Sequence, residues 1–170
     1  MKKILIAAAV LAATPALAQP IPTILPNPTQ AEGTAPRPER ARGIPTALAV
    51  EAAMQSNSTC QANGTRVTTI VVDSVGEPIA MISNDGAATI TQRIAMGKAQ
   101  YSIQTRAPSA EGGKAAPDVV AKLGVARPGG IPILVGNDLV GAIAASGSPS
   151  GQADEVCVRA GLAKIQDRLK

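Results

Sequence analysis

Two pairs of β-rich runs, each joined by a short turn, constrain the fold of this chain more than any other feature of its sequence. Tight spacing of this kind is typical of β-hairpins, in which neighbouring strands are antiparallel. The runs of the first hairpin are residues 66–72 and 78–83, and those of the second are residues 131–135 and 139–145. Four runs therefore favour an antiparallel sheet.

Helical signals lie before, between and after the two hairpins. Thr46 has the character of an N-cap, and Thr89 with Gln92 three residues later fits a capping box. Ser148 is expected to cap the last helix. One further helical turn is expected at residues 118–123. The pattern predicts an α+β fold of the order helix-hairpin-helix-hairpin-helix, with helices packed against the sheet.

The N-terminal part of the chain is expected to lie outside this domain, which spans residues 44–170. Residues 1–18 combine a positive end, a short apolar stretch and an Ala-x-Ala site, the pattern of a secretory signal peptide cut between Ala18 and Gln19. Neither this stretch nor a later one reaches the roughly 20 apolar residues of a membrane span. Residues 19–43, rich in proline and arginine, are predicted to be a disordered spacer. We therefore expect a periplasmic or secreted protein.

Cys60 and Cys157 are the two cysteines of the chain. In an exported protein such a pair is more often a disulfide than a metal or redox site. Closing so long a loop stabilises the folded state by about 4 to 5 kcal/mol in the chain-entropy model. This cross-link matters because the chain has no Phe or Trp to fill its core. Two free buried thiols are the alternative.

Histidine is absent from the chain, which excludes Ser-His-Asp and Cys-His catalysis, His-rich zinc sites and imidazole ligation of haem. Tyr101 is the one aromatic residue, so the chain has almost no side chains on which nucleic acid bases could stack. Loss of the signal peptide would lower the net charge from +4 to +2 because it removes Lys2 and Lys3. That balance is too weak to predict nucleic acid or an anionic membrane as a partner.

The glycine-rich stretch at residues 129–155 raises the question of a phosphate-binding loop. Its glycines lack the spacing of a dinucleotide fingerprint, and no Gly-Lys-Ser or Gly-Lys-Thr triplet of a P-loop occurs. The sequence GSPSG places Pro149 where a nucleophile elbow requires serine. The acidic residues mostly fall at turns or helix caps, although paired carboxylates are not excluded by sequence. No catalytic residue is assigned.

Seven short motifs, taken in order, resemble those of the GlcG/HbpS-like family of small haem-binding proteins. This family shares its fold with the C-terminal domain of some cobalamin adenosyltransferases. The motifs are VVDSVG at 71–76, NDGA at 84–87, GKAQYS at 97–102, Arg106 with Pro108, GGIPI at 129–133, GAIAASG at 141–147 and DEVCVRAG at 154–161. The resemblance covers nearly all of residues 45–170.

The resemblance implies an antiparallel sheet of about five strands, assembly into a homo-oligomer, and haem or a related tetrapyrrole as the bound cofactor. It also implies that Cys60 ends the first helix and Cys157 lies in the last one, so that antiparallel packing brings them together. No nucleic acid partner and no membrane span are implied.

The ligand set for such a tetrapyrrole has several candidates. Without histidine, the iron ligand would be Tyr101, Lys98, a methionine or a hydroxyl. Lys98 or Arg106 would be the cation that pairs with a haem propionate. In the alternative interpretation Tyr101 is a core residue, and Lys98 lies at the surface or in a salt bridge.

Three functions follow from these observations. The first is an exported haem-binding protein in haem uptake, storage or sensing. The second is a non-catalytic structural or interaction oligomer that keeps the fold without the ligand. The third is an enzyme with a minor activity on a small glycolate-like acid.

Overall fold

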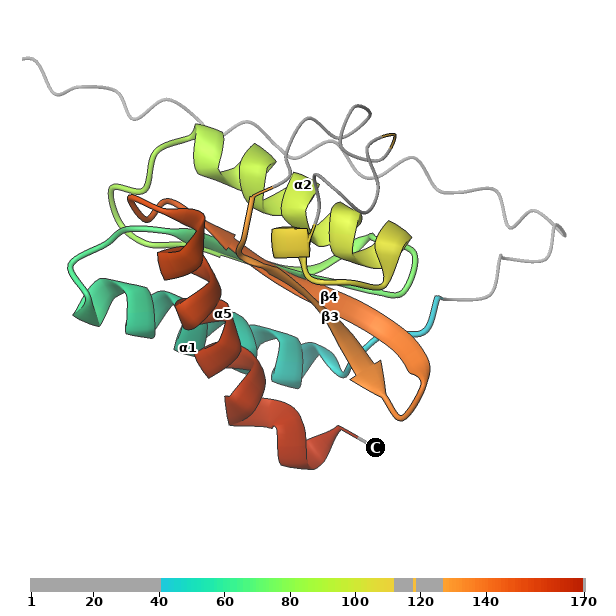
Figure 1. Ribbon diagram of the computed structural model, residues 1–170. Helices are drawn as coiled ribbons and strands as arrows, with labels where there is room; N and C mark the ends of the chain where they lie inside the picture. The colour runs from blue at the N-terminus through green and yellow to red at the C-terminus, as the bar shows by residue number, and fades with distance from the viewer. Residues whose placement is uncertain (1–40, 112–117, 119–126, 170) are drawn as a thin grey trace, which may run out of the picture. The chain divides into compact units, whose positions relative to one another are not determined.

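The computed structural model describes residues 41–111, 118 and 127–169 of the chain. The expected signal peptide, residues 19–40 of the expected spacer and all but Asp118 of the expected helical turn lie outside the described residues. The described elements are α1 (Thr46–Ala62), β1 (Thr68–Val72), β2 (Pro78–Ser83), α2 (Ile90–Thr105), η1 (Ser109–Glu111), β3 (Gly130–Val135), β4 (Asp138–Ser146), α5 (Gly151–Ile165) and η2 (Gln166–Arg168) (Figure 1).

The described strands form one antiparallel sheet in the order β2-β1-β4-β3. The two hairpins lie side by side because β1 pairs with β4, in a register that runs from Thr68 opposite Ser146 to Val72 opposite Ala142. The expectation of about five strands is corrected to four for the described residues, since each of the four β-rich runs supplies one strand. The expected element order is matched only in part, because η1 lies between α2 and β3 and η2 follows α5.

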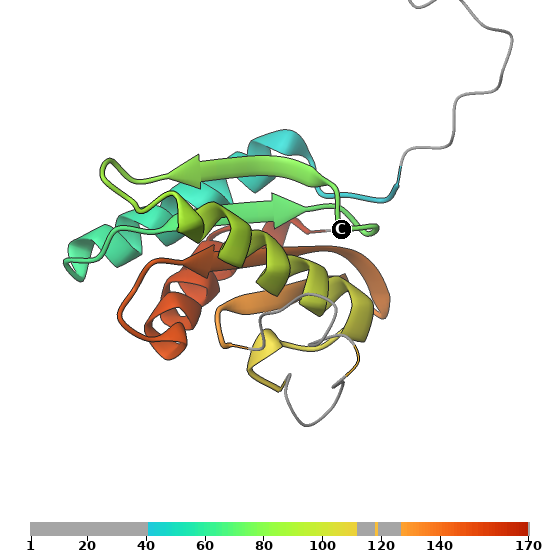
Figure 2. The same cartoon turned by 90° about the horizontal axis from the view of Figure 1, so that it is seen from above.

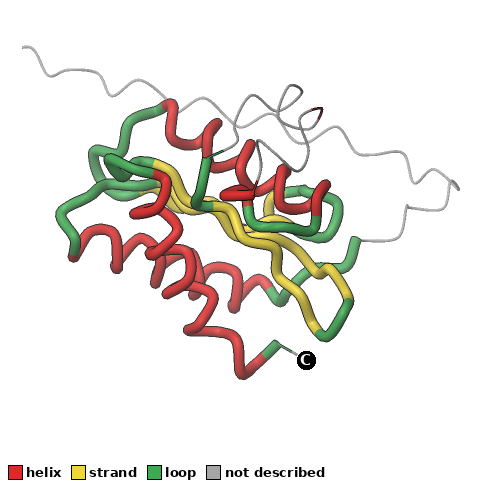
Figure 3. The backbone as a smooth tube through the Cα atoms, viewed as in Figure 1, coloured by secondary structure: helices red, strands yellow, loops and turns green. Residues whose placement is uncertain are grey.

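The sheet is covered on both faces, with α1 and α5 on one side and α2 on the other (Figures 2 and 3). All five residues of β1 are buried, as expected for a central strand covered on both sides. Its residue Val71 faces α1 and α5, whereas Ile70 and Val72 face α2. The two faces therefore hold separate apolar clusters.

Small side chains let α1 and α5 pack closely. A Cβ at Gly161 of α5 would lie 2.4 Å from the carbonyl oxygen of Ala52 in α1. Cys60 of α1 and Cys157 of α5 are joined by a disulfide, with 5.5 Å between their Cα atoms. This is the pairing that the sequence allowed. No helix within the described residues is both long and apolar enough to cross a membrane.

The helix caps differ from the sequence-based expectations. Pro45 rather than Thr46 is the N-cap of α1. Thr89 precedes α2 in a helical conformation and makes no side-chain cap bond, so the expected capping box is not formed. Ser150 rather than Ser148 caps α5: its extended backbone lets its hydroxyl accept a hydrogen bond from Ala153 N.

Candidate functional site

A buried ion pair ties three elements together. Lys98 of α2 lies with its Nζ 2.8 Å from Oδ2 of Asp154 in α5, and the two side chains are 2% and 4% exposed. The same Nζ donates to the carbonyl oxygen of Ala145 in β4 at 2.8 Å. The other carboxylate oxygen of Asp154 accepts from Ser148 N at 2.8 Å. The pair therefore fixes the first turn of α5 against α2 and β4.

Two consecutive glycines make room for this ion pair. Gly129 has a φ of +113°, and a Cβ there would lie 2.8 Å from Lys98 Nζ and 2.9 Å from Asp154 Cβ. A Cβ at Gly130 would lie 2.6 Å from the carbonyl oxygen of Lys98. A larger residue at Gly129 would collide with both members of the ion pair, and one at Gly130 would collide with the backbone of α2. In this structure the first glycines of the stretch serve close packing around a buried charge.

The surroundings of Lys98 shift its titration. Burial is the main cause and lowers the pKa of the ammonium group below its ordinary value of 10.5, and the charge of Arg127 acts in the same direction. The hydrogen bond and the charge of Asp154 oppose this shift without cancelling it. Lys98 is therefore a buried cation whose charge is balanced by the carboxylate of Asp154.

The three residues expected to bind a ligand have different surroundings. Lys98 is engaged with Asp154, whereas Tyr101 is fully buried and its Oη has no hydrogen-bond partner among the described residues. Arg106 follows α2 in the left-handed conformation and donates from Nη2 to Asn137 O at 2.6 Å, on the exposed turn between β3 and β4. The described structure does not gather these three polar groups at one open site.

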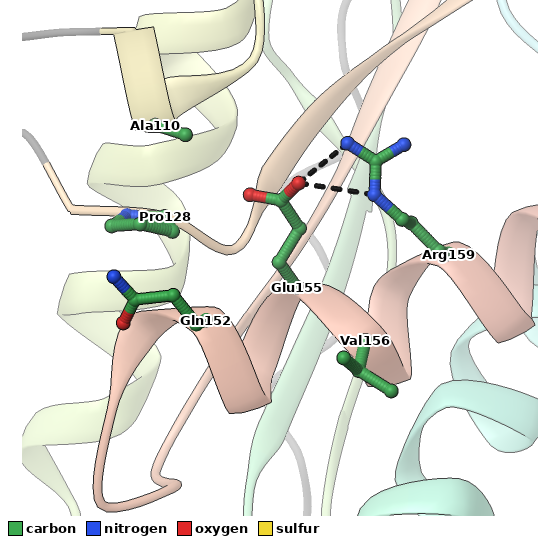
Figure 4. A pocket seen from close by; sticks show the side chains of 6 residues that line it. All are labelled: Ala110, Pro128, Gln152, Glu155, Val156 and Arg159. Carbon is green, nitrogen blue, oxygen red and sulfur yellow. Dashed lines mark hydrogen bonds and ion pairs between the residues drawn. The ribbon is translucent and has the colours of Figure 1, made fainter.

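An open cavity of about 350 Å³ lies between η1, the segment that leads into β3, and one face of α5. Gly151 lets α5 begin directly against Pro128, because a Cβ at this glycine would lie 2.7 Å from the carbonyl oxygen of Pro128. Figure 4 shows the side chains around the cavity. They are Ala110, Pro128, Gln152, Glu155, Val156 and Arg159.

The cavity combines an apolar wall with one ion pair. Val156 is 58% exposed although it is apolar, and Ala110 and Pro128 lie across from the helix (Figure 4). Glu155 Oε1 accepts hydrogen bonds from Nε of Arg159 at 3.0 Å and from its Nη2. The side chains are 15% and 60% exposed respectively. Such a site suits a ligand with an apolar body and a carboxylate.

Sequence reasoning assigned no binding role to Glu155 or Arg159. The available signal was the acidic residue four positions before a basic one on an expected helix, which predicts an ion pair but not a cavity beside it. Within the described ranges, no group of three or more Cys, Asp or Glu side chains is placed to hold a metal ion.

The chain belongs to the family described as haem degrading protein HbpS-like, whose family model matches residues 44–163. This match confirms the resemblance seen in the motifs. No curated protein matches the chain.

Solved structures agree with this assignment. HbpS is 29% identical, with a TM-score of 0.68, and the match covers 74% of this chain and 92% of that one. A double mutant of HbpS from Streptomyces reticuli is 27% identical, with a TM-score of 0.68 and coverage of 90% and 97%. A complex of PduOC with haem has a TM-score of 0.65 and coverage of 72% and 95%, but at 17% identity it shows the shared fold alone.

Proposed function

We propose that this protein binds haem or a closely related tetrapyrrole. The observation that carries the proposal is the family match over residues 44–163, which spans the sheet and nearly all of its covering helices. PduOC, which shares this fold, has been solved in complex with haem. When bound, haem would supply a redox-active iron.

The described side chains fit the outer part of a tetrapyrrole. Haem needs an apolar surface for its ring and cations for its propionates. At the cavity of α5, Val156 supplies apolar surface for the ring, and Arg159 supplies a cation for a propionate. Its volume of about 350 Å³ is at the lower end of ligand pockets, so part of the ring would stay outside it.

A residue that held the haem iron would do so through an oxygen, a thioether or an amine, since histidine is absent and both cysteines form the disulfide. Tyr101 stays our proposed iron ligand from α2, because its phenol is buried without a partner among the described residues. Lys98 and Arg106 stay proposed propionate partners, and using Lys98 would require breaking its ion pair.

Haemin titration tests the proposed function. Saturable binding with a shift of the Soret band is expected for the disulfide-bonded protein. Free haemin spectra at every protein concentration would contradict the proposal and favour an oligomer without ligand. Tyr101→Phe is expected to change the spectrum of the complex. An unchanged spectrum and affinity would reject Tyr101 as the ligand.

A degradative activity is the second candidate, since the family is described as haem degrading. The readout is the Soret band of the haem complex after a reductant and oxygen are added. Loss of the band together with release of a linear tetrapyrrole would assign the enzyme activity. A stable band through many hours would favour uptake, storage or sensing.

We also propose export and assembly of the protein. The expected cut between Ala18 and Gln19 and the disulfide, which persists in oxidising compartments, support a periplasmic or secreted location. Mass spectrometry of the protein from cell fractions should show a chain that begins at Gln19. Light scattering of the purified protein should show a homo-oligomer, and a monomer mass would reject that part of the proposal.

A further inference from the structure

We propose that the cavity at α5 is the haem site of this chain, with Arg159 as the anchor of one propionate and Glu155 as an internal competitor for it. This inference rests on the proposed function. It differs from the sequence-based expectation, in which Lys98 or Arg106 of the α2 region supplies the cation.

The geometry favours Arg159 over the two expected cations. The ammonium group of Lys98 is enclosed and already holds Asp154, and Arg106 holds a backbone carbonyl on the β3–β4 turn. Arg159 is accessible, with its side chain 60% exposed at the rim of a cavity. Its guanidinium is therefore the cation at this cavity that can meet a ligand without unfolding any part of the core.

The apolar wall of the cavity would determine how the ligand is oriented. Val156 lies within one turn of Arg159 on the cavity face of α5, and it is one of the most exposed large apolar side chains described. A ring lying against Val156 and Pro128 would leave an attached carboxylate free to reach Arg159. An exposed apolar side chain rimmed by polar groups is typical of a binding surface.

The carboxylate of Glu155 occupies the position beside the guanidinium of Arg159 that a propionate would take. Its Oε1 accepts from both Nε and Nη2 of Arg159, so two of the donors of the guanidinium are occupied. A propionate must displace this carboxylate or share the guanidinium with it. Because pairs of this spacing are weak and the side chain of Arg159 is 60% exposed, the exchange is accessible at ambient temperature.

This competition predicts opposite effects for two neighbouring substitutions. Arg159→Gln removes the anchor and should weaken haemin binding about three- to ten-fold, given the strength of charge-assisted hydrogen bonds and the exposure of this side chain. Glu155→Gln removes the competing charge and should tighten haemin binding about two-fold or more. A purely structural role for the pair would weaken binding in both variants.

The experiment is a Soret titration of the wild-type protein and both variants with haemin and with haemin dimethyl ester, which lacks free carboxylates. Arg159→Gln should leave ester binding unchanged. The matched control is Arg168→Gln, which breaks an exposed ion pair with Glu51 that does not line the cavity. It should bind haemin like the wild type, and thermal unfolding of all variants should show that each is folded.

The possible outcomes distinguish a wrong binding site from a failure of the proposed haem binding. If the wild type does not bind haemin, the proposed function fails. If it binds haemin but Arg159→Gln binds equally well, the site at α5 is wrong and haem binding stands. Weaker binding by Glu155→Gln would overturn the competition. Equal losses in Arg168→Gln and Arg159→Gln would show an effect of net charge and overturn the anchor.

Discussion

Lys98 and Asp154, 56 positions apart in the sequence, form an enclosed ion pair 2.8 Å long at the point where α2, β4 and α5 meet. Desolvation of two charges is costly, and here their attraction is supplemented by hydrogen bonds from Ser148 N and to Ala145 O. The pair also places the first turn of α5, which Glu155 and the adjoining cavity wall directly follow. Its energetics therefore bear on the proposed binding site.

Removing one partner of this pair should be strongly destabilising. Lys98→Met leaves the carboxylate of Asp154 buried without its cation, and we expect the free energy of unfolding to fall by about 3 to 5 kcal/mol. Urea unfolding of the variant measures the loss. The double variant Lys98→Met/Asp154→Leu should recover most of it, because it leaves no unpaired charge.

An exposed pair supplies the matched control for that experiment. Arg42→Gln breaks the ion pair between Arg42 and Asp138, whose side chains are 71% and 66% exposed. Its effect on the free energy of unfolding should stay below about 1 kcal/mol. Equal losses for Lys98→Met and Arg42→Gln would show that burial does not govern the strength of the Lys98 pair.

Stability should depend on alkaline pH through Lys98. Because its pKa is lower in the folded protein than the ordinary 10.5, the unfolded chain binds more protons between these two values. The free energy of unfolding should therefore rise with pH in that window, relative to the double variant without the pair. Chemical denaturation of both proteins across alkaline pH measures this difference. A relative fall with rising pH would mean that the folded state raises this pKa.

Gly129→Ala should disturb the ion pair directly. The new Cβ would lie 2.8 Å from Lys98 Nζ, in a backbone region that side chains rarely adopt, and we expect a loss of about 2 to 4 kcal/mol. Gly136→Ala is the control, since its φ is also positive but nothing lies within 4 Å of the added atom. It should lose about 1 kcal/mol from the backbone alone. Equal losses in thermal or urea unfolding would contradict the role of Gly129.

The disulfide should account for a large part of the stability of this small-residue core. Replacing Cys60 and Cys157 by serine opens a loop with a sequence separation of 97, and a loss of about 2 to 5 kcal/mol is expected in urea unfolding. Reduction of the wild type should show the same loss and add two free thiols per chain. Identical thiol counts before and after reduction would reject the disulfide.

Local chemistry explains which parts of the fold could be predicted. The turn at Gly136 and the two apolar runs beside it specify a hairpin within a few residues, so β3 and β4 lie close to their expected bounds. The cap of α5 was assigned to Ser148 rather than Ser150, because both serines flank Pro149 and only the backbone conformation decides between them. The fifth strand, which the described residues do not contain, was expected from the family resemblance and not from a run in the sequence.

The site depends on contacts that local patterns do not encode. A salt bridge was one of the alternatives for Lys98, but its partner Asp154 could not be identified, since the pairing depends on how α2 and α5 cross the sheet. The cavity likewise depends on the contact between Gly151 and Pro128. Arg159 belongs to the motif at residues 154–161, but its position at the rim of the cavity depends on the three-dimensional fold.

Anomalous diffraction at the iron edge from crystals grown with haemin tests the central claim most directly. The account predicts an iron peak beside the cavity of α5, with a propionate within hydrogen-bond distance of Arg159. An iron peak elsewhere on the fold, with the guanidinium of Arg159 still paired to Glu155, would contradict the account.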